Sequence, residues 1–426
     1  MKEKSGGVFE ELLETQQIFD DREYLRSSYV PENLPHREEQ IDKLARIWVA
    51  PLRGETPSNV FIYGKTGTGK TATVKYLMEE LEGVASDLSK EIEVSYLNCE
   101  VVDTKYRVLA TLANNVREEL IDGVDVEDLS DFPDEVPMTG WPTDEVYENL
   151  VELLDYREQF IIVILDEIDR LVSKGTSDVL YLLSRLNSDL TNAKVGVVGI
   201  SNDLEFASDL DPRIKSSLGE EEVVFPPYNA PQLEDILEER SEKGFSDGIL
   251  EDGVIRLCAA HAARKHGDAR KALDMLRNAG EIAEEEKSKK VTTSHVTKAS
   301  KKIERDRMEE AVESLPNQSK LVLMSVLVLQ ERKSSRVSTG DIYEVYSSLC
   351  QQQGWEVLSR RRVSGLISEL DMMGVVNARV VSNGRHGRTK EVELKVDPLQ
   401  VRSAVQDEIY VQDLDSLPVR KQKRLG

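Results

Sequence analysis

Short apolar runs alternate with amphipathic stretches along the first half of the chain. Five of these runs have the length and composition of buried strands, at residues 59–63, 92–98, 160–165, 194–200 and 222–225. Apolar runs of this kind, separated by helical stretches, are typical of parallel strands that helices cover on both faces. The pattern therefore predicts an α/β core built on a five-stranded parallel sheet.

The pattern changes twice further along the chain. From residue 231 to about residue 315 it is all helical, with apolar positions at helical spacing such as Leu233, Leu237, Leu273 and Leu276. After Pro316 come three expected helices and two alternating runs, at residues 317–330, 339–352, 359–373, 375–382 and 389–396. Three helices and a hairpin predict a winged helix-turn-helix. The expected domains are a nucleotide-binding core (1–225), a helical lid (226–315), a winged helix (316–400) and a tail (401–426).

Charge distinguishes residues 316–426 from the rest of the chain. The chain of 426 residues has a net charge of −24, but residues 316–426 carry 17 Lys and Arg against 13 Asp and Glu. A basic unit on an acidic body indicates a polyanion partner for that unit. The acidic surplus elsewhere resembles the surfaces of proteins from salt-loving microbes, and an acidic protein from an ordinary cell is the alternative.

Neither a membrane segment nor a cysteine framework is expected. The longest apolar run has six residues, 160–165, and the first twenty residues are polar, which predicts a cytoplasmic protein with no membrane partner. Cys99, Cys258 and Cys350 are too far apart to indicate a zinc site or a disulfide framework. Residues 118–135 hold nine carboxylates and no basic residue, which is typical of a solvated loop.

A glycine-rich sequence follows the first expected strand directly. Residues 64–71 read Gly-Lys-Thr-Gly-Thr-Gly-Lys-Thr, the phosphate-binding pattern G-x-x-x-x-G-K-[ST] between a strand and a helix. The N–H groups of such a loop surround a β-phosphate, and the helix N-terminus adds its positive end. We expect Lys70 to reach the β- and γ-phosphates and the Thr71 hydroxyl to bind Mg²⁺. The predicted phosphate-binding residues are Gly64, Gly67, Thr68, Gly69, Lys70 and Thr71.

Polar residues follow two later strands. Asp166 and Glu167 come directly after the run 160–165, and Asn202 comes after the run 194–200. Ligands of open α/β sheets bind at the edge where parallel strands end, so these side chains are expected together. We expect Asp166 to hold Mg²⁺ and Glu167 to polarise the attacking water. Asn202 stands at the sensor-one position of the AAA+ ATPases, which the chain resembles, although an Asn after a strand is otherwise a turn residue.

Two arginines fit the same scheme. Arg213, in Asp-Pro-Arg, matches the arginine finger that AAA+ proteins supply to a neighbour's γ-phosphate, with an ordinary surface arginine as the alternative. Gly267 reads as a helix stop and Asp268 as an N-cap, which places Arg270 in the first turn of the next helix. A cation opposes the helix dipole there unless an anion is near. Arg270 therefore matches the sensor-two arginine, which couples lid closure to bound ATP.

The motifs occur in one order, and together they resemble one family. They lie at residues 30–41 (Val-Pro-Glu-Asn-Leu-Pro-His-Arg-Glu-Glu-Gln-Ile), 64–71, 166–169, 211–213 and 267–270. This arrangement is similar to the archaeal DNA replication initiators, relatives of the largest eukaryotic origin-recognition subunit and of the cell division control protein that loads the helicase. The resemblance implies an ATPase whose slow hydrolysis serves as a switch, with ATP and Mg²⁺ as cofactors.

The resemblance also implies contacts that spacing does not give. The segment 30–41 would flank the adenine, and Tyr228 and Arg240 match nucleotide-binding positions, although from the sequence alone they read as a hinge aromatic and a solvated helix residue. Residues 136–143, with Thr139 and Gly140, resemble the element that grips DNA from the ATPase domain. The implied partners are double-stranded origin DNA, the replicative minichromosome maintenance helicase, and other initiator copies or paralogues on DNA.

The third expected helix of the winged region carries the features of a DNA-reading helix. Val363, Leu366, Ile367, Leu370 and Met373 are predicted to be its buried stripe, with Arg361, Ser364, Gly365 and Ser368 on the opposite face, suited to a major groove. Arg360, Arg361 and Arg362 crowd the helix start, where phosphates would compensate them. Arg385 and Arg388, in the hairpin connection, are expected at the adjacent minor groove. A protein-binding winged helix is the alternative.

These observations favour an ATP-switched initiator that binds origin DNA and helps to recruit the replicative helicase. Two other classes share some of the features. One is an ATP-switched winged-helix regulator of signalling or transcription, and the other is a clamp-loader-like ATPase subunit, whose C-terminal domain is a helical collar. The Asn383-Gly384 hairpin signal argues against the collar.

Overall fold

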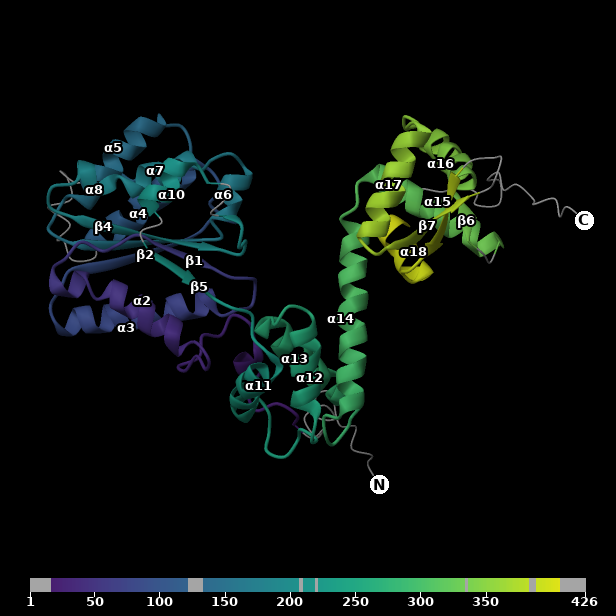
Figure 1. Cartoon of the computed structure of the whole chain (residues 1–426), viewed down its shortest axis with the longest axis horizontal. Helices are drawn as coiled ribbons and strands as arrows, with labels where there is room; N and C mark the ends of the chain where they lie inside the picture. Colours follow the sequence, from purple (N-terminus) through teal and green to yellow (C-terminus); the bar gives the residue numbers. More distant parts are fainter. Residues whose placement is uncertain are drawn as a thin grey trace, which may run out of the picture. The chain divides into compact units, whose positions relative to one another are not determined.

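The computed structural model describes residues 17–121, 133–206, 210–218, 221–333, 336–382 and 388–406 of the chain. Residues 1–297 and 298–426 form two compact units, with the boundary inside the helix α14 (Thr293–Glu313) (Figure 1). No helix in these described ranges is long and apolar enough to cross a bilayer.

Five parallel strands form the sheet of the first unit, in the order β2-β3-β4-β1-β5. The strands are β1 (Val60–Tyr63), β2 (Ile92–Asn98), β3 (Phe160–Asp166), β4 (Lys194–Ser201) and β5 (Glu221–Val224). The five-stranded parallel sheet is confirmed, and each strand begins and ends within one residue of its predicted position. The central strands are apolar throughout because alternate residues enter two different cores.

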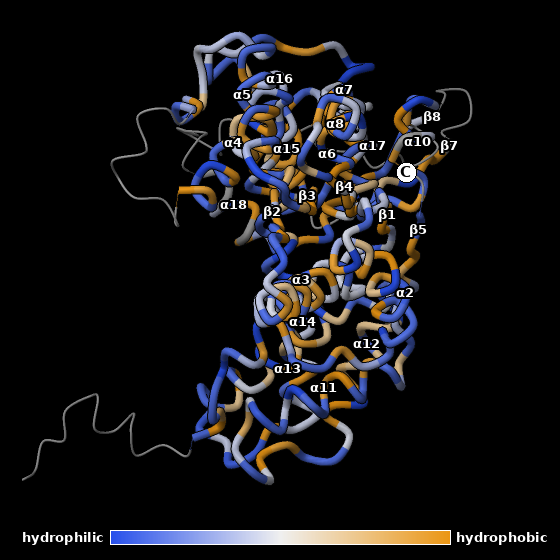
Figure 2. Tube along the Cα trace, turned by 90° about the vertical axis from the view of Figure 1, so that its left-hand side faces the viewer, coloured by the Kyte–Doolittle hydropathy of each residue, from blue (hydrophilic) through white to orange (hydrophobic). Residues whose placement is uncertain are grey.

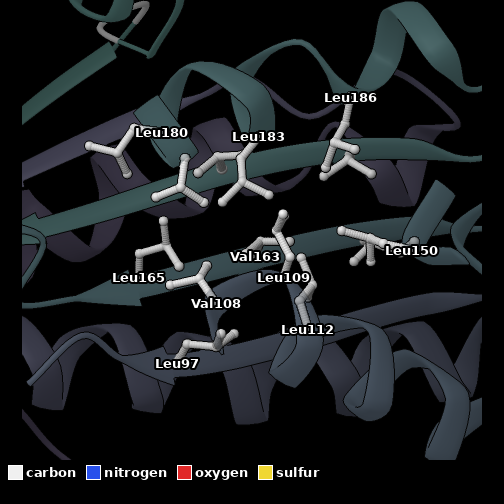
Figure 3. Packing of buried hydrophobic residues seen from close by; sticks show 14 of the residues in the cluster. Leu97, Val108, Leu109, Leu112, Leu150, Val163, Leu165, Leu180, Leu183 and Leu186 are labelled. Atoms are coloured by element: carbon white, nitrogen blue, oxygen red, sulfur yellow. The ribbon is translucent and has the colours of Figure 1, made fainter. Parts of the chain in front are cut away.

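Helices cover both faces of this sheet. One face packs Phe61, Val163 and Val197 against the helices of one core, and the other packs Ile62 and Ile164 against those of the second core. The first core is formed with α4 (Lys105–Ile121), α5 (Thr143–Leu154), α7 (Asp178–Ser184) and α8 (Leu186–Asp189), and the second with α2 (Glu38–Trp48) and α3 (Lys70–Asp87). Figure 3 shows leucines of α4 and α7 meeting strand residues in the first core.

Shorter elements also occur in the sheet-containing part of the first unit. They are η1 (Arg22–Leu25), η2 (Pro51–Arg53), α6 (Asp169–Ser173) and α10 (Pro212–Leu218). The strands β1, β3 and β4 are mostly hydrophobic, whereas the helices carry both hydrophobic and hydrophilic residues (Figure 2). The two-faced core thus follows from the hydrophobic pattern of the sequence.

The region after β5 is helical, as predicted. It contains α11 (Ala230–Gly244), α12 (Val254–Arg264), α13 (Ala269–Glu285) and α14 (Thr293–Glu313). Asn229 caps α11 in a reciprocal capping box with Gln232. Asp268 caps α13, as predicted, and its side chain accepts a hydrogen bond from the N–H of Lys271.

The N-terminal strap, residues 17–29, lies against these lid helices. Phe19 pairs with Phe245 in an isolated antiparallel bridge, and their ring centroids are 4.8 Å apart. The Arg240 guanidinium of α11 donates to the carbonyl oxygens of Tyr24 and Arg26 and stacks 4.4 Å from the Tyr29 ring centroid. The chain therefore packs against the lid helices before it forms the first strand of the sheet.

The second unit is a winged helix. Its elements are α15 (Asn317–Lys333), β6 (Val337–Ser338), α16 (Thr339–Gln353), α17 (Arg360–Met372), β7 (Val376–Ser382), β8 (Arg388–Leu394) and α18 (Pro398–Gln406). The strands form an antiparallel sheet in the order β6-β8-β7. The predicted helices and hairpin are confirmed. The helix α18 was not predicted.

The predicted buried stripe of α17 is correct except at its end. Val363, Leu366, Ile367 and Leu370 are buried in the core of this unit, but the side chain of Met373 is 54% exposed. The helix ends at Met372, and the chain then turns through Gly374 at a positive φ of 76°. Because the helical periodicity stops before Met373, its predicted burial is wrong.

Candidate functional site

The phosphate-binding sequence forms a tight turn between β1 and α3. Gly69 stands at the helix N-cap with φ of +89°, and a Cβ atom there would lie 2.8 Å from the Tyr228 hydroxyl. Only glycine adopts this conformation at low cost and leaves room for the tyrosine. The glycine at position 69 therefore allows both the tight turn of the loop and the close approach of Tyr228, which lies beyond the sheet.

Lys70 is the first residue of α3, and its ammonium group is buried beneath the loop. Its Nζ donates to the carbonyl oxygens of Gly64 at 2.7 Å and Lys65 at 2.9 Å, and to Asn202 Oδ1 at 2.9 Å. Burial lowers the pKa of Lys70 to about 8, against the opposing attraction of Asp166. The structure thus brings together Lys70 and Asn202, two of the predicted site residues.

Asp166 ends β3 at the same edge of the sheet. Its Oδ2 accepts hydrogen bonds from the Thr71 hydroxyl at 2.8 Å and the Tyr96 hydroxyl at 2.7 Å. Its Oδ1 accepts one from the N–H of Glu167 at 2.9 Å. The Asp166 side chain is therefore fixed on both oxygens. Burial and this hydrogen bond raise the pKa of Tyr96 far above its usual range, so its hydroxyl remains a donor.

Glu167 and Asn202 lie beside this carboxylate. Glu167 has a positive φ of 59°, an uncommon conformation for a residue with a side chain. Burial first, and then the neighbouring carboxylates of Glu100 and Asp166, raise the pKa of Glu167. Asn202 Nδ2 donates to Glu167 Oε1 at 3.5 Å, and its N–H donates to Asp169 Oδ1 at 3.2 Å. The side-chain amide of Asn202 thus joins Lys70 to Glu167.

A cleft of about 340 Å³ opens beside the loop, within the size range of small-ligand sites. It is lined by the loop residues Gly67 to Thr71, by residues between 26 and 35, which include the end of the strap, and by the lid residues Ile236, Arg240, Arg270 and Leu273. Arg270 lies in the first turn of α13 with its side chain exposed. Its positive charge contributes to the lowering of the Lys70 pKa. The predicted loop and lid residues therefore face one another across this cleft.

Tyr228 and Arg240 lie at the cleft in different ways. Tyr228 is 5% exposed and packs on the loop at Gly69. Arg240 is 6% exposed, and its guanidinium is engaged by the carbonyl oxygens of the strap. Burial lowers the pKa of Arg240 to about 10. The reading of Arg240 as a solvated helix residue is thus wrong, because the strap covers it.

Arg213 lies apart from the cleft. Its side chain is 74% exposed, and its guanidinium pairs with the Asp211 carboxylate at 2.9 Å and lies 5.6 Å from the Tyr181 ring centroid. Pairing with Arg213 holds the pKa of Asp211 at about 2. Arg213 is therefore not among the residues that line the cleft of the same molecule.

Sequence reasoning missed Arg37 as a separate site residue. It is 2% exposed, and its guanidinium donates to the carbonyl oxygens of Thr68 at 2.8 Å and Pro226 at 2.7 Å. Its Cζ lies 3.7 Å from the centroid of the Tyr228 ring. The only signal in the sequence is its place in the motif at residues 30–41, which indicates a nucleotide-flanking segment without singling out one side chain.

The segment with Thr139 and Gly140 is an exposed turn held to α4. Tyr106 donates to the carbonyl of Pro137 at 2.7 Å, and Asn114 exchanges two hydrogen bonds with Val136. Gly140 has φ of +112° with open space around it, and Thr139 is exposed. The turn is therefore anchored at its start and presents its tip outward.

The arginines at the start of α17 are exposed, and each is placed differently. Arg360 lies 4.8 Å from the Tyr343 ring centroid, Arg362 pairs with Glu369 at 3.2 Å, and Arg361 makes no ion pair with the described residues. Ser364 and Ser368 are half-buried, with Lys390 Nζ donating to the Ser364 carbonyl at 3.2 Å. Arg385 lies outside the described residues, as does the side chain of Arg388.

A P-loop sheet, a helical lid and a winged helix in one chain define an ATPase of the AAA+ class. The AAA ATPase domain model matches residues 33–198, the Cdc6 AAA+ ATPase-type lid model matches residues 234–301, and the Cdc6 C-terminal winged-helix model matches residues 310–404.

Relatives narrow this class to one family. The ORC1-type DNA replication protein of Thermococcus onnurineus is 53% identical over 418 residues, or 98% of each chain. That of Haloarcula marismortui, number 4, is 48% identical over 97% of this chain and 86% of the relative. The solved structure of the Aeropyrum pernix ORC1 protein in complex with DNA has a TM-score of 0.75 and 47% identity, covering 92% of this chain and 98% of that one.

The chain belongs to the family of ORC1-type DNA replication proteins. Its C-terminal unit is a winged helix and not a helical collar, so the clamp-loader-like alternative is wrong. The halophilic source expected from the acidic surplus is not confirmed, since the identity to the Haloarcula relative is no higher than that to the Thermococcus relative.

Proposed function

We propose that this chain is an ATP-switched replication initiator that binds origin DNA and is reset by slow hydrolysis. The observation that carries the proposal is the convergence of Lys70, Thr71 and Arg270 at one cleft, with Asp166 hydrogen-bonded to Thr71 beside it. The same chain also bears a winged helix. Family membership and the DNA-bound Aeropyrum relative support the assignment.

The cleft would receive the triphosphate of ATP. The loop's N–H groups and the start of α3 would surround the β-phosphate. Lys70 would then exchange its hydrogen bonds to the Gly64 and Lys65 carbonyls for phosphate oxygens, with Asn202 retained as a partner beside the γ-phosphate. Tyr228, Arg240 and the strap would enclose the nucleoside side of the cleft.

Thr71 and Asp166 are the residues that would hold Mg²⁺. Their side-chain oxygens lie 2.8 Å apart at the strand edge, and hard oxygen donors of this kind suit that cation. When bound, Mg²⁺ neutralises charge on the β- and γ-phosphate oxygens. Glu167, whose pKa is raised, would orient and polarise the attacking water.

The two arginines divide the remaining roles. Arg270 would close the lid on the γ-phosphate from the first turn of α13. Arg213, exposed on α10, would serve a neighbouring molecule's nucleotide when initiator copies or paralogues assemble on DNA. Both assignments rest on placement together with the motif order.

DNA contact is assigned to both units. Arg360, Arg361 and Arg362 would meet phosphates, Ser364 and Ser368 would face the major groove, and Arg385 and Arg388 would enter the minor groove. The exposed turn at Thr139 and Gly140 would make a second contact from the ATPase core. The replicative minichromosome maintenance helicase is the partner proposed to be recruited, in the cytoplasm.

The test is a chromosomal binding map for the wild-type chain and for Lys70→Ala, followed by binding to the recovered duplex in ATP and in ADP. We expect sites clustered at replication starts, with nucleotide-dependent affinity for wild type and none for the variant. Salt must be matched, because phosphate contacts weaken by orders of magnitude as salt rises. Sites spread over promoters without enrichment at replication starts would favour the winged-helix regulator.

A further inference from the structure

Arg37 is an internal cation held almost entirely by main-chain carbonyl groups. Its side chain is among the largest of those fully buried in the described part of the chain. Nε donates to the Thr68 carbonyl at 2.8 Å, Nη1 to that of His36 at 2.9 Å, and Nη2 to that of Pro226 at 2.7 Å. The planar guanidinium thus uses each of its three nitrogens on a different residue.

A buried charge of this kind is costly unless something compensates it. No carboxylate forms an ion pair with Arg37 in the described residues, and its face lies 3.7 Å from the Tyr228 ring centroid. Burial lowers the pKa of the Arg37 guanidinium, because a cation removed from water loses hydration. Stability alone does not favour an arginine here, because an apolar side chain of similar volume avoids that cost.

The segments that Arg37 joins belong to different parts of the first unit. Thr68 is in the phosphate loop, whereas Pro226 and Tyr228 form the hinge, the connection from β5 to α11 at residues 225–229. Tyr228 also donates its N–H to the Gly267 carbonyl at 3.2 Å, just before α13. A shift of the loop carbonyl at Thr68 therefore reaches the hinge through one side chain.

The residue before Arg37 reaches the lid directly. His36 has a positive φ of 64°, which turns it away from α2, and its Nε2 lies 2.8 Å from Asp235 Oδ2 of α11. Two adjacent residues thus contact the loop, the hinge and the lid. They stand at the entry to α2, which packs on the sheet and gives them a rigid base.

We propose that Arg37 is a positioning residue that transmits the shape of the phosphate loop to the hinge, so that nucleotide binding sets the lid. This inference rests on the proposed function, because it requires a nucleotide at the loop. The guanidinium acts through the Thr68 and Pro226 carbonyls and the Tyr228 ring, and it needs no contact with phosphate. Charge attraction alone and a purely structural role are the competing explanations.

Two variants separate these explanations. Arg37→Lys keeps the charge but cannot span three carbonyl groups with one planar group. Arg37→Met keeps the apolar volume and leaves no buried charge, which favours folding. Arg46→Gln, on the exposed side of α2 and paired with Asp42, is the matched control. Thermal unfolding without nucleotide shows which variants are folded.

The readouts are fluorescent ATP and ADP affinity and hydrogen exchange at the hinge, with and without nucleotide, in the full chain. For Arg37→Lys and Arg37→Met we expect affinity about tenfold weaker or worse, and loss of the nucleotide-dependent slowing of exchange at residues 225–237, while residues 64–71 still slow at saturation. A structural role alone would leave that slowing intact. The control should match wild type.

Specific results would overturn the proposal. If Arg37→Lys bound like wild type and only Arg37→Met were weak, attraction by charge would explain the residue. If both folded variants kept the hinge response at saturating ATP, no transmission would pass through Arg37. If wild type itself bound no nucleotide, the proposed function would fail first, which is a distinct outcome.

Discussion

The main-chain carbonyl of Gly67 accepts a hydrogen bond from the N–H of Ala269 over 3.0 Å. The phosphate loop therefore touches the first turn of lid helix α13 through the backbone. Next to this bond, a Cβ atom on Gly67 would lie 1.7 Å from Asp268 Oδ1, the residue that caps α13. The phosphate loop and the lid are thus in direct contact, one residue before Arg270.

Gly67→Ala should break this contact between the loop and the lid. Gly67 has φ of +72°, and the added methyl group would collide with Asp268, so we expect a loss of at least about 2 kcal/mol of unfolding free energy together with loss of ATP binding. Gly83→Ala is the control, since that helical glycine of α3 has open space around it and should gain about 0.5–1 kcal/mol. Chemical denaturation and nucleotide titration measure both. Unchanged ATP affinity in Gly67→Ala would contradict the expectation.

The lowered pKa of Lys70 predicts a pH dependence of nucleotide affinity. The pKa is about 8 in the nucleotide-free fold, and phosphate would raise it, so binding above pH 8 should take up a proton. Affinity should be level below about pH 7 and fall toward tenfold per pH unit above about pH 8. Calorimetry in buffers of different ionisation enthalpy measures the uptake, which Lys70→Ala should abolish.

The same group affects stability with the opposite sign. Because its folded pKa is below the ordinary value of 10.5, the unfolded chain binds more protons between about pH 8 and 10.5. The Lys70 contribution to the free energy of unfolding therefore rises with pH across that window, and below it the full cost of the buried charge is present. The free energy of unfolding of wild type minus that of Lys70→Ala, followed by denaturation at several pH values, should increase as pH rises from about 8 to 10.5. A constant difference would argue against a lowered pKa.

Tyr96→Phe should weaken the cation site without touching the phosphate loop. Tyr96 supplies one of two hydroxyl donors to Asp166 Oδ2, and its loss leaves the carboxylate held only by the Thr71 hydroxyl and the Glu167 N–H. We expect ATP affinity in Mg²⁺ to fall about threefold to tenfold, with no change in EDTA. Tyr76→Phe on α3 serves as the control, because its hydroxyl makes no hydrogen bond with Asp166. Equal losses with and without Mg²⁺ would rule out the orienting role.

Local pattern predicts the strands and helices well, and contacts distant in sequence explain what it misses. The strands β1, β3 and β4 are readable because burial on both faces requires continuous apolar runs. Arg37 is not readable, since its burial depends on Thr68, 31 residues away, and Pro226, 189 residues away. A polar residue becomes internal only when the fold supplies carbonyl partners that no window of sequence contains.

Arg240 and Met373 illustrate the same limit in opposite directions. Arg240 sits in a polar stretch of α11, yet the strap at Tyr24 covers it. Met373 fits the apolar period of α17, yet the helix ends one residue earlier and exposes it. Lys70 and Arg270 are readable from local sequence because each lies in the first turn of a helix, and both line the cleft. Their roles toward a nucleotide stay a prediction.

Arg361 is the residue of α17 that best tests the proposed contact with DNA. It begins the helix beside Arg360 and Arg362 but, unlike Arg362, has no ion pair with a described residue. If it meets a phosphate, Arg361→Ala should weaken binding to an origin repeat and reduce the slope of log affinity against log salt by about 1. Arg402→Ala removes the same charge from α18, where Glu331 holds it at 2.6 Å, and should leave the slope unchanged. Fluorescence anisotropy over a salt series measures both, and equal losses in the two variants would mean that net charge, not α17, carries the binding.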